Sequence, residues 1–322
     1  MNPEFRRNLW LELTPHRLVA MPLLLVLVLA LVYAASDDKM TGVAVAAAII
    51  AAGLLGIWGT RSSADCVIEE VRARTWDAQR MSAIGPWEMA WGKLLGAASF
   101  AWYGGLMALA VVLFATPRGW AHSSAKVAAL IAAGALLMQC VACLAGISAA
   151  RKGYARQGSV GAWLIVLLIV ALGPGIGFFT SEHAPVAWWR ERYGAMNFTL
   201  ASTACFAGWA AFGVYRVLCG ELQVRTTPWA FAGFILFLAG YVAGFWVVPG
   251  ADAARARDAF LISGLLVAGT LTYIQLFAEQ TGVIVFRHVQ VRLARGELRR
   301  ALEELPCWTV GFAMAAVFCV LG

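Results

Sequence analysis

Long apolar runs, separated by short polar segments, follow one another along most of the chain. A helix needs about 20 apolar residues to cross the roughly 30 Å hydrocarbon core of a bilayer. Runs near that length cover residues 18–35, 42–58, 94–116, 127–150, 160–179, 198–215, 229–248, 260–278 and 307–321. Because lipid cannot satisfy backbone hydrogen bonds, such continuous runs predict helices rather than barrel strands. We therefore expect an all-α, polytopic integral membrane helical bundle of about nine transmembrane helices.

The basic residues between these runs predict the orientation of the bundle. If the N-terminus is cytoplasmic, 18 of the 25 Lys and Arg residues fall in inside segments and 7 in outside segments. This asymmetry is what the positive-inside rule requires. The formal net charge of +7 thus reflects topology, and we expect no nucleic-acid partner. A composition of 61% hydrophobic and 13% charged residues excludes a soluble enzyme.

The first apolar run has one alternative interpretation, a cleaved signal peptide. Arg6, Arg7 and Arg17 precede it, and Ala35-Ser36 resembles a cleavage site. The run is longer than the 7 to 15 residues of an ordinary signal-peptide core. Its length favours a retained span.

The apolar runs lack the groups that would let the chain power or catalyse a reaction. All 18 acidic residues can be assigned to loops or helix ends, so no carboxylate is placed to carry a coupling proton through the bilayer. Gly92-Lys93 is followed by Leu94, so it does not form a nucleotide-binding phosphate loop. Cys140 and Cys143 lie in an apolar run, where such a spacing is typical of packing. We expect no catalytic residue, metal or cofactor.

The polar segment between the second and third runs has a regular pattern. Between residues 68 and 78, apolar or small residues recur at helical spacing. Pro86 suits the first turn of a following helix, and Gly85 suits the break before it. The segment therefore predicts a short amphipathic helix, a break, and a helix leading into the third span. Charged or aromatic residues occupy the rest of its surface: Glu69, Glu70, Arg72, Arg74, Trp76, Asp77 and Arg80.

This segment resembles the first cytoplasmic loop of ABC-2 type transporter permeases. The resemblance is carried by Thr75-Trp76-Asp77, Pro86-Trp87-Glu88 and Gly92-Lys93-Leu94-Leu95, whose spacing fits without a gap. It implies that the segment is a coupling helix docked on a separate ATP-binding cassette ATPase subunit, with the seven residues above as the docking contacts. Arg74 stands where the family often has Gly, and Ala78-Gln79-Arg80 replaces a leucine run. Docking through a more polar surface is therefore expected.

The resemblance also implies a domain organisation. Residues 1–17 would form an amphipathic helix along the cytoplasmic face, and residues 18–225 a six-helix permease core with coupling loop 60–93. An external hairpin would correspond to residues 180–197. Residues 226–322 add three transmembrane helices with a basic amphipathic loop at 279–305, whose arginines favour anionic lipid.

Together these features predict the permease subunit of an ATP-driven transporter in the bacterial cytoplasmic membrane, working as an exporter. A second permease, identical or different, and membrane lipid are the other expected partners. Gly173, Pro174 and Gly175 would loosen the fifth span, either to line a transport path or as a kink without a transport role. The alternative function is a non-transporting scaffold or assembly subunit. Neither the cargo nor the direction of transport follows from the residues themselves.

Overall fold

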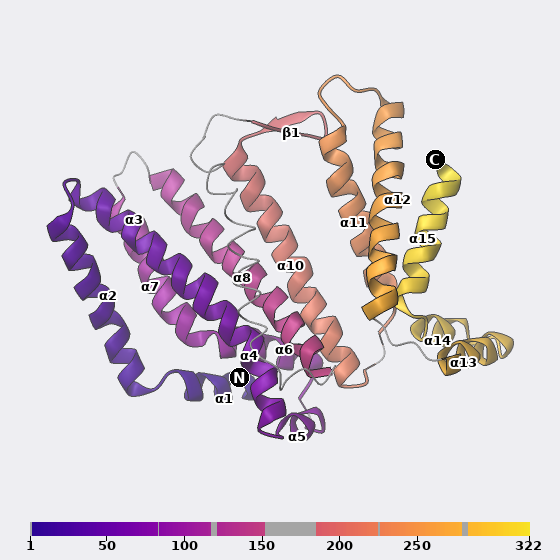
Figure 1. Cartoon of the computed structure of the whole chain (residues 1–322), viewed down its shortest axis with the longest axis horizontal. Helices are drawn as coiled ribbons and strands as arrows, with labels where there is room; N and C mark the ends of the chain where they lie inside the picture. The colour runs from indigo at the N-terminus through magenta and orange to yellow at the C-terminus, as the bar shows by residue number, and fades with distance from the viewer. Residues whose placement is uncertain (1, 83, 117–120, 152–184, 225, 279–282) are drawn as a thin grey trace. The chain divides into compact units, whose positions relative to one another are not determined.

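The described part of the chain is almost entirely helical, as predicted (Figure 1). The computed structural model describes residues 2–82, 84–116, 121–151, 185–224, 226–278 and 283–322. Six of its helices are long and apolar enough to cross a membrane: Pro15–Ala35, Lys39–Arg72, Ser123–Ala150, Ala195–Glu221, Trp229–Trp246 and Ala253–Leu276. A bent pair is a seventh candidate, and Cys307–Leu321 is apolar but shorter. The run at 160–179, with Gly173, Pro174 and Gly175, lies outside the described residues, so nine spans stay a prediction.

The chain divides into two compact units. Unit 1 comprises Met1–Glu182 and Ala195–Val224, and unit 2 comprises His183–Gly194 and Arg225–Gly322. The elements of unit 1 are α1 (Pro3–Glu12), α2 (Pro15–Ala35), α3 (Lys39–Ala52), η1 (Gly53–Trp58), α4 (Gly59–Arg72), α5 (Trp76–Arg80), α6 (Pro86–Ala97), α7 (Ser99–Ala115), α8 (Ala121–Arg151) and α10 (Ala195–Glu221). Those of unit 2 are β1 (Val186–Trp188), β2 (Glu191–Tyr193), α11 (Trp229–Trp246), α12 (Ala253–Ala278), α13 (Val283–Ala294), α14 (Leu298–Glu303) and α15 (Cys307–Leu321).

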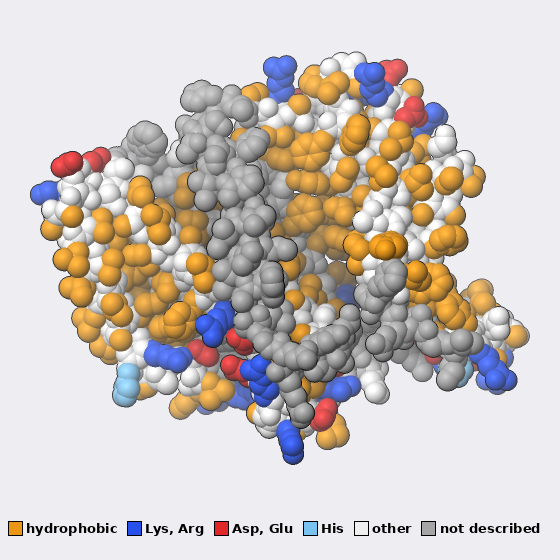
Figure 2. Space-filling model, in the orientation of Figure 1, with side chains coloured by type: hydrophobic (Ala, Val, Ile, Leu, Met, Phe, Trp, Pro, Cys, Tyr) orange, Lys and Arg blue, Asp and Glu red, His pale blue; other side chains and the backbone are white. Residues whose placement is uncertain are grey.

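The N-terminal helix α1 is shorter than the 1–17 segment predicted from the sequence. Its start is fixed by Asn2, whose side-chain oxygen accepts the backbone N–H groups of Glu4 and Phe5. It ends at Glu12, and Pro15 begins α2 in the position where proline is tolerated. Figure 2 shows apolar side chains over α2 and charged side chains gathered at the end of unit 1 where α1 and α5 lie. This distribution suits a bundle whose side faces lipid.

The second span contains a π-helix. Within η1 the bonding widens to five residues, since the backbone N–H of Gly59 donates to the carbonyl of Leu54. Gln139 of α8 donates its amide N–H to the Leu55 carbonyl at 2.9 Å and accepts the Trp102 indole N–H at 2.9 Å. The helix then continues through α4 to Arg72. The predicted coupling loop 60–93 is therefore helical at its start, and the chain first turns away after Arg72.

The third predicted span, 94–116, is divided by a bend near its beginning. Residues up to Ala97 belong to α6, and α7 begins at Ser99 after a bend of 60°. Before this bend, Gly92 and Gly96 of α6 allow α1 to approach closely. A Cβ on Gly92 would lie 2.7 Å from the Glu4 side chain, and one on Gly96 2.7 Å from Asn8. Small residues four apart permit such close helix packing. Helix α6 therefore packs against α1, and the apolar helix α7 follows it after the bend.

Unit 2 contains a two-stranded hairpin that the all-α prediction did not include. Strands β1 and β2 pair antiparallel, with Val186 opposite Tyr193. Trp189 and Arg190 both have positive φ (47° and 69°), as a tight hairpin turn requires. The indoles of Trp188 and Trp189 donate to the Tyr241 and Gly240 carbonyls of α11. The described part of the predicted 180–197 hairpin therefore packs on α11, a helix beyond residue 225.

The other helices of unit 2 form one apolar core and a short helical pair. Ile235, Ala239 and Leu261 are buried at the contact between α11 and α12, and Phe318 of α15 joins them. The described part of the predicted basic loop, 283–305, contains α13 and α14. The turn between them includes Gly296, whose φ of 76° suits glycine.

Candidate functional site

The residues predicted to dock on an ATPase lie on α4, on α5 and on the turn between them. A single short amphipathic helix was expected here, but α4 ends at Arg72. Arg74 adopts a left-handed conformation with φ of 58°. The N–H of Thr75 donates to the Glu70 carbonyl, and that of Arg74 to the Val71 carbonyl, which is the bonding of a Schellman motif. This turn separates α5 from α4 and redirects it.

A buried lysine lies behind α5. Lys93 of α6 has a relative exposure of 0%. Its ammonium contacts the carboxylate of Glu70, lies 3.3 Å from that of Glu4, and donates to the Gln79 side chain at 3.1 Å. It also lies 5.1 Å from the centre of the Trp76 ring, within the range of a cation–π interaction. A desolvated ammonium is retained only when it is paired and hydrogen-bonded, and Lys93 meets both conditions.

Two carboxylates and a second cation complete this cluster, which we call the Lys93 cluster (Lys93, Glu4, Glu70, Arg7, Gln79 and Trp76). Glu4 of α1 has a side-chain exposure of 2% and accepts from Arg7 at 3.0 Å. Arg7 also contacts Glu70, and Gln79 donates to Glu70 at 2.8 Å. Four elements, α1, α4, α5 and α6, therefore meet at one charged centre. Each charged member contacts two groups of opposite charge, so removing one weakens the balance of a buried centre.

Three of the seven predicted docking residues face inward. Glu70 belongs to the Lys93 cluster, and Trp76 is buried in an apolar cluster with residues of α4, α6, α8 and α10. Arg80 donates to the backbone carbonyl of Glu221 at 3.1 Å and lies 3.7 Å from its carboxylate. These side chains fix α5 against α6 and α10. Their placement indicates a positioning role within the chain.

The other four, Glu69, Arg72, Arg74 and Asp77, are exposed. On α5 and the residue after it, the outward surface consists of Asp77, Ala78 and Met81. Met81 has a relative exposure of 83% and is the large apolar side chain of this surface. We call Arg74, Asp77, Ala78 and Met81 the α5 outer surface. The sequence pattern did not single out Met81.

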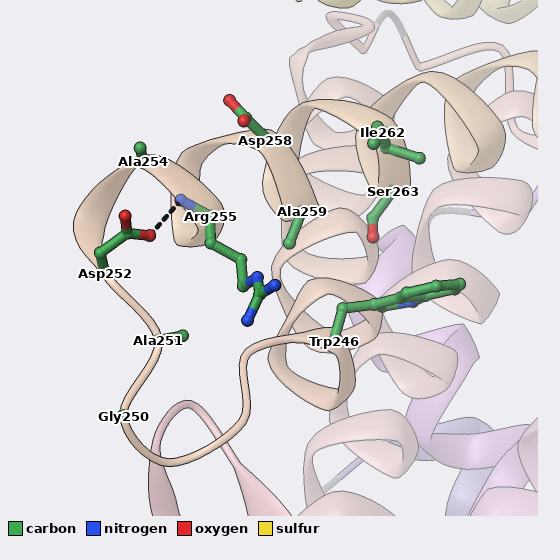
Figure 3. Close-up of a pocket in the computed structure, with 10 residues that line it drawn as sticks. All are labelled: Trp246, Gly250, Ala251, Asp252, Ala254, Arg255, Asp258, Ala259, Ile262 and Ser263. Atoms are coloured by element: carbon green, nitrogen blue, oxygen red, sulfur yellow. Dashed lines mark hydrogen bonds between the residues drawn. The ribbon is translucent and has the colours of Figure 1, made fainter.

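A surface pocket lies in unit 2, at the start of α12 (Figure 3). It is an open surface pocket of about 760 Å³. Asp252 accepts the backbone N–H of Arg255 at 2.9 Å and so serves as a helix cap. In Figure 3 the guanidinium of Arg255 extends toward Trp246, whereas Asp258 points away. Because its carboxylates serve the helix start or face outward, this pocket is a weaker candidate than the Lys93 cluster.

Sequence analysis did not identify Lys93, Glu4, Arg7 or Gln79 as functional residues. One signal was available, because Lys93 is the single charge within the otherwise apolar stretch 89–117. Predicting that Glu4 and Arg7 lie near Lys93 would also have required the close approach of α1 at Gly92. That approach depends on packing between segments far apart in the sequence. In the described residues, no group of three or more His, Cys, Asp or Glu side chains is arranged to hold a metal ion.

Comparisons with protein-family models, with curated proteins and with solved structures found no match to this chain.

Proposed function

We propose that the chain is the membrane-spanning permease subunit of an ATP-driven, ABC-type transporter in the bacterial cytoplasmic membrane. In this proposal the α5 outer surface docks on a separate ATPase subunit, and the permease works as an exporter with a second permease. The resemblance of residues 75–95 to ABC-2 permeases gives the class. The observation that carries the proposal is the burial of Lys93, which ties a short exposed helix to several helices of unit 1.

The proposed mechanism is transmission of force through rigid contacts. A helix of five residues has no stability of its own in water, so α5 keeps its position through its neighbours. Glu70 and Gln79 join it to Lys93 on α6, and Arg80 joins it to Glu221 at the end of α10. A displacement of the α5 outer surface is therefore passed to α6 and α10. In this proposal the ATPase supplies the energy, and the permease changes which side of the membrane its transport path opens to. The two sites are thereby coupled.

The decisive experiment is reconstitution of the full chain with an ATPase subunit that copurifies with it. The ATPase rate is measured with and without the permease in proteoliposomes. Met81→Glu introduces a charge at the centre of the docking surface, and we expect it to lower permease-stimulated ATP hydrolysis by about tenfold. Leu298→Glu is the matched control, because Leu298 on α14 is also an exposed apolar residue, at 64%, and lies outside the α5 outer surface.

Two results would contradict the proposal. One is that no nucleotide-hydrolysing protein accompanies the purified chain. The other is that Met81→Glu and Leu298→Glu have equal effects on ATP hydrolysis. Copurification of an ATPase whose rate does not depend on this chain would instead favour the scaffold or assembly function.

A further inference from the structure

Unit 1 contains an open groove of about 980 Å³ that borders the Lys93 cluster at Arg7 and Glu70. Residues of α1, η1 and α4 form most of its wall. Its apolar part includes Ile50, Leu54, Ile57 and Trp58, of which Ile57 and Trp58 are 46% and 51% exposed. The groove therefore exposes apolar side chains next to a charged surface.

The wall changes from apolar to charged along one continuous helix. Lys39–Arg72 has 34 residues and is about 50 Å long at 1.5 Å per residue. The hydrocarbon core is only about 30 Å thick, so one end of this helix must leave it. The change falls between Trp58, a residue typical of the membrane interface, and Arg61. The groove consequently lies where lipid tails meet lipid headgroups.

Three charged side chains follow Trp58 in a fixed order on the groove face of α4. Arg61, Asp65 and Glu69 are four residues apart and therefore lie on one face, about 6 Å from each other along the axis. The Arg61 guanidinium is only loosely paired, because it lies 3.7 Å from the Asp65 carboxylate and its side chain is exposed. Glu69 makes no ion pair with any residue that the structure describes. On this face of α4 one cation is therefore followed by two carboxylates. The other charged residues of the groove wall are all ion-paired within the protein: Arg7, Arg17, Glu12 and Glu70.

From this order we propose that the groove binds a phospholipid whose headgroup carries a phosphate followed by a primary ammonium. Its acyl chains would lie against Ile57 and Trp58, its phosphate against Arg61, and its ammonium between Asp65 and Glu69. A guanidinium matches phosphate oxygens in a bidentate geometry, and an ammonium has three donors for carboxylates. A lipid with phosphate as its only charge satisfies Arg61 but meets repulsion from the two carboxylates.

Gly53 gives the groove its depth. It lies on the apolar wall, and a Cβ placed on it meets no atom within 4 Å. A large side chain at this position would therefore occupy space that a lipid tail would otherwise fill, without a clash inside the protein. Gly56 lies in the same π-helix and is equally open, but it is not part of the groove wall. The pair provides a test variant and a matched control.

The test is native mass spectrometry of the purified full chain, titrated in detergent with phosphatidylethanolamine or phosphatidylglycerol of equal chain length. We expect the ethanolamine lipid to be retained about tenfold more strongly than the glycerol lipid. Glu69→Gln should reduce this preference toward equal binding. Gly53→Phe should abolish retention of the ethanolamine lipid, whereas Gly56→Phe should leave it unchanged.

Equal or stronger binding of the glycerol lipid to the unmodified chain would overturn the proposal, because the carboxylates would then have no part in recognition. Retention of the ethanolamine lipid by Gly53→Phe, when circular dichroism shows that the variant is folded, would overturn the placement in this groove. The measurement uses no ATP and no ATPase subunit. Its outcome is therefore independent of the proposed transport function.

Discussion

Glu4 and Lys93 lie 89 positions apart in the sequence, yet the carboxylate of one and the ammonium of the other are 3.3 Å apart, with side-chain exposures of 2% and 0%. This contact joins the first helix of the chain to α6. The hydropathy pattern did not predict this packing of α1 on α6. The charged centre of unit 1 is therefore an organising contact for its backbone.

Replacing Lys93 by Met is predicted to destabilise unit 1 strongly. The substitution leaves Glu4 and Glu70 buried or partly buried without their ammonium partner, and breaking a buried pair in this way costs about 3 to 5 kcal/mol. Thermal unfolding of the purified chain in detergent measures the effect. Lys39→Met is the control, because Lys39 is exposed and its cation–π contact with the Tyr33 ring, at 5.2 Å, is worth no more than about 1 kcal/mol at such a site.

The same measurement on the triple variant Lys93→Met, Glu4→Gln and Glu70→Gln tests the cause. With Lys93 gone, Glu4 and Glu70 keep only Arg7 as a cationic partner. Neutralising both carboxylates should recover part of the lost stability, since neutral polar groups are cheaper to bury than charges. If the triple variant is less stable than Lys93→Met alone, the charges are not the origin of the loss.

Arg74→Gly is predicted to stabilise the turn between α4 and α5. Arg74 has a φ of 58°, a conformation that costs a residue with a Cβ about 1 kcal/mol and costs glycine almost nothing. The unfolding midpoint should rise accordingly. Ala78→Gly, in the exposed part of α5, is the control and should lower stability by about 0.5 to 1 kcal/mol. A loss of stability in Arg74→Gly would show that its side chain outweighs the backbone strain.

Gly244→Ala is predicted to disrupt the hairpin on α11. A Cβ at this position would lie 2.1 Å from the Trp188 indole nitrogen, which donates to the Tyr241 carbonyl at 3.0 Å. The ring must move, at a cost of about 1 to 3 kcal/mol. Hydrogen exchange at residues 186–193 should accelerate. Gly240→Ala is the control, because its Cβ would meet only Phe260, at 3.9 Å. Equal acceleration of hydrogen exchange in both variants would contradict this account.

The cap of α3 predicts a specific pH dependence. Hydrogen bonds from Thr41 lower the pKa of Asp38 below its ordinary value of 3.8. A carboxyl with a lowered folded pKa adds stability above pH 3.8, and that stability is lost as the pH falls through the folded value. Asp38→Asn keeps a good cap and should remove this component of the acid dependence. Thr41→Ala should shift it toward pH 3.8, as measured by thermal unfolding at pH 2 to 5.

The hydrophobic pattern predicted the parts of the fold that depend on local sequence. The described apolar runs lie mostly in helices, although the run 94–116 is divided by the bend before α7. Pro86 begins α6 with Gly85 as its N-cap, as expected. These features follow from lipid solvation of the backbone and from the fixed geometry of proline. Each of these features depends on residues that are close together in the sequence, so the sequence of this chain was sufficient to predict them.

The features that were missed depend on contacts between distant segments. The inward orientation of Glu70 and Trp76 depends on Lys93, and the hairpin at 186–193 depends on carbonyls of α11. The break at Arg74 was missed because arginine, unlike glycine, gives no signal for a left-handed turn. Exposure of Met81 depends on which face of α5 the other contacts hold inward.

The widened turn at η1 would allow α4 to rotate about its own axis. A π turn contains about one residue more than an α turn, and each residue of an α-helix corresponds to about 100° around its axis. The hydrogen bond from Gln139 to Leu55 holds the extra residue in place. Loss of this hydrogen bond would let the π turn convert to an α turn. Arg61, Asp65 and Glu69 would then rotate about the axis of α4 and face a different side of unit 1.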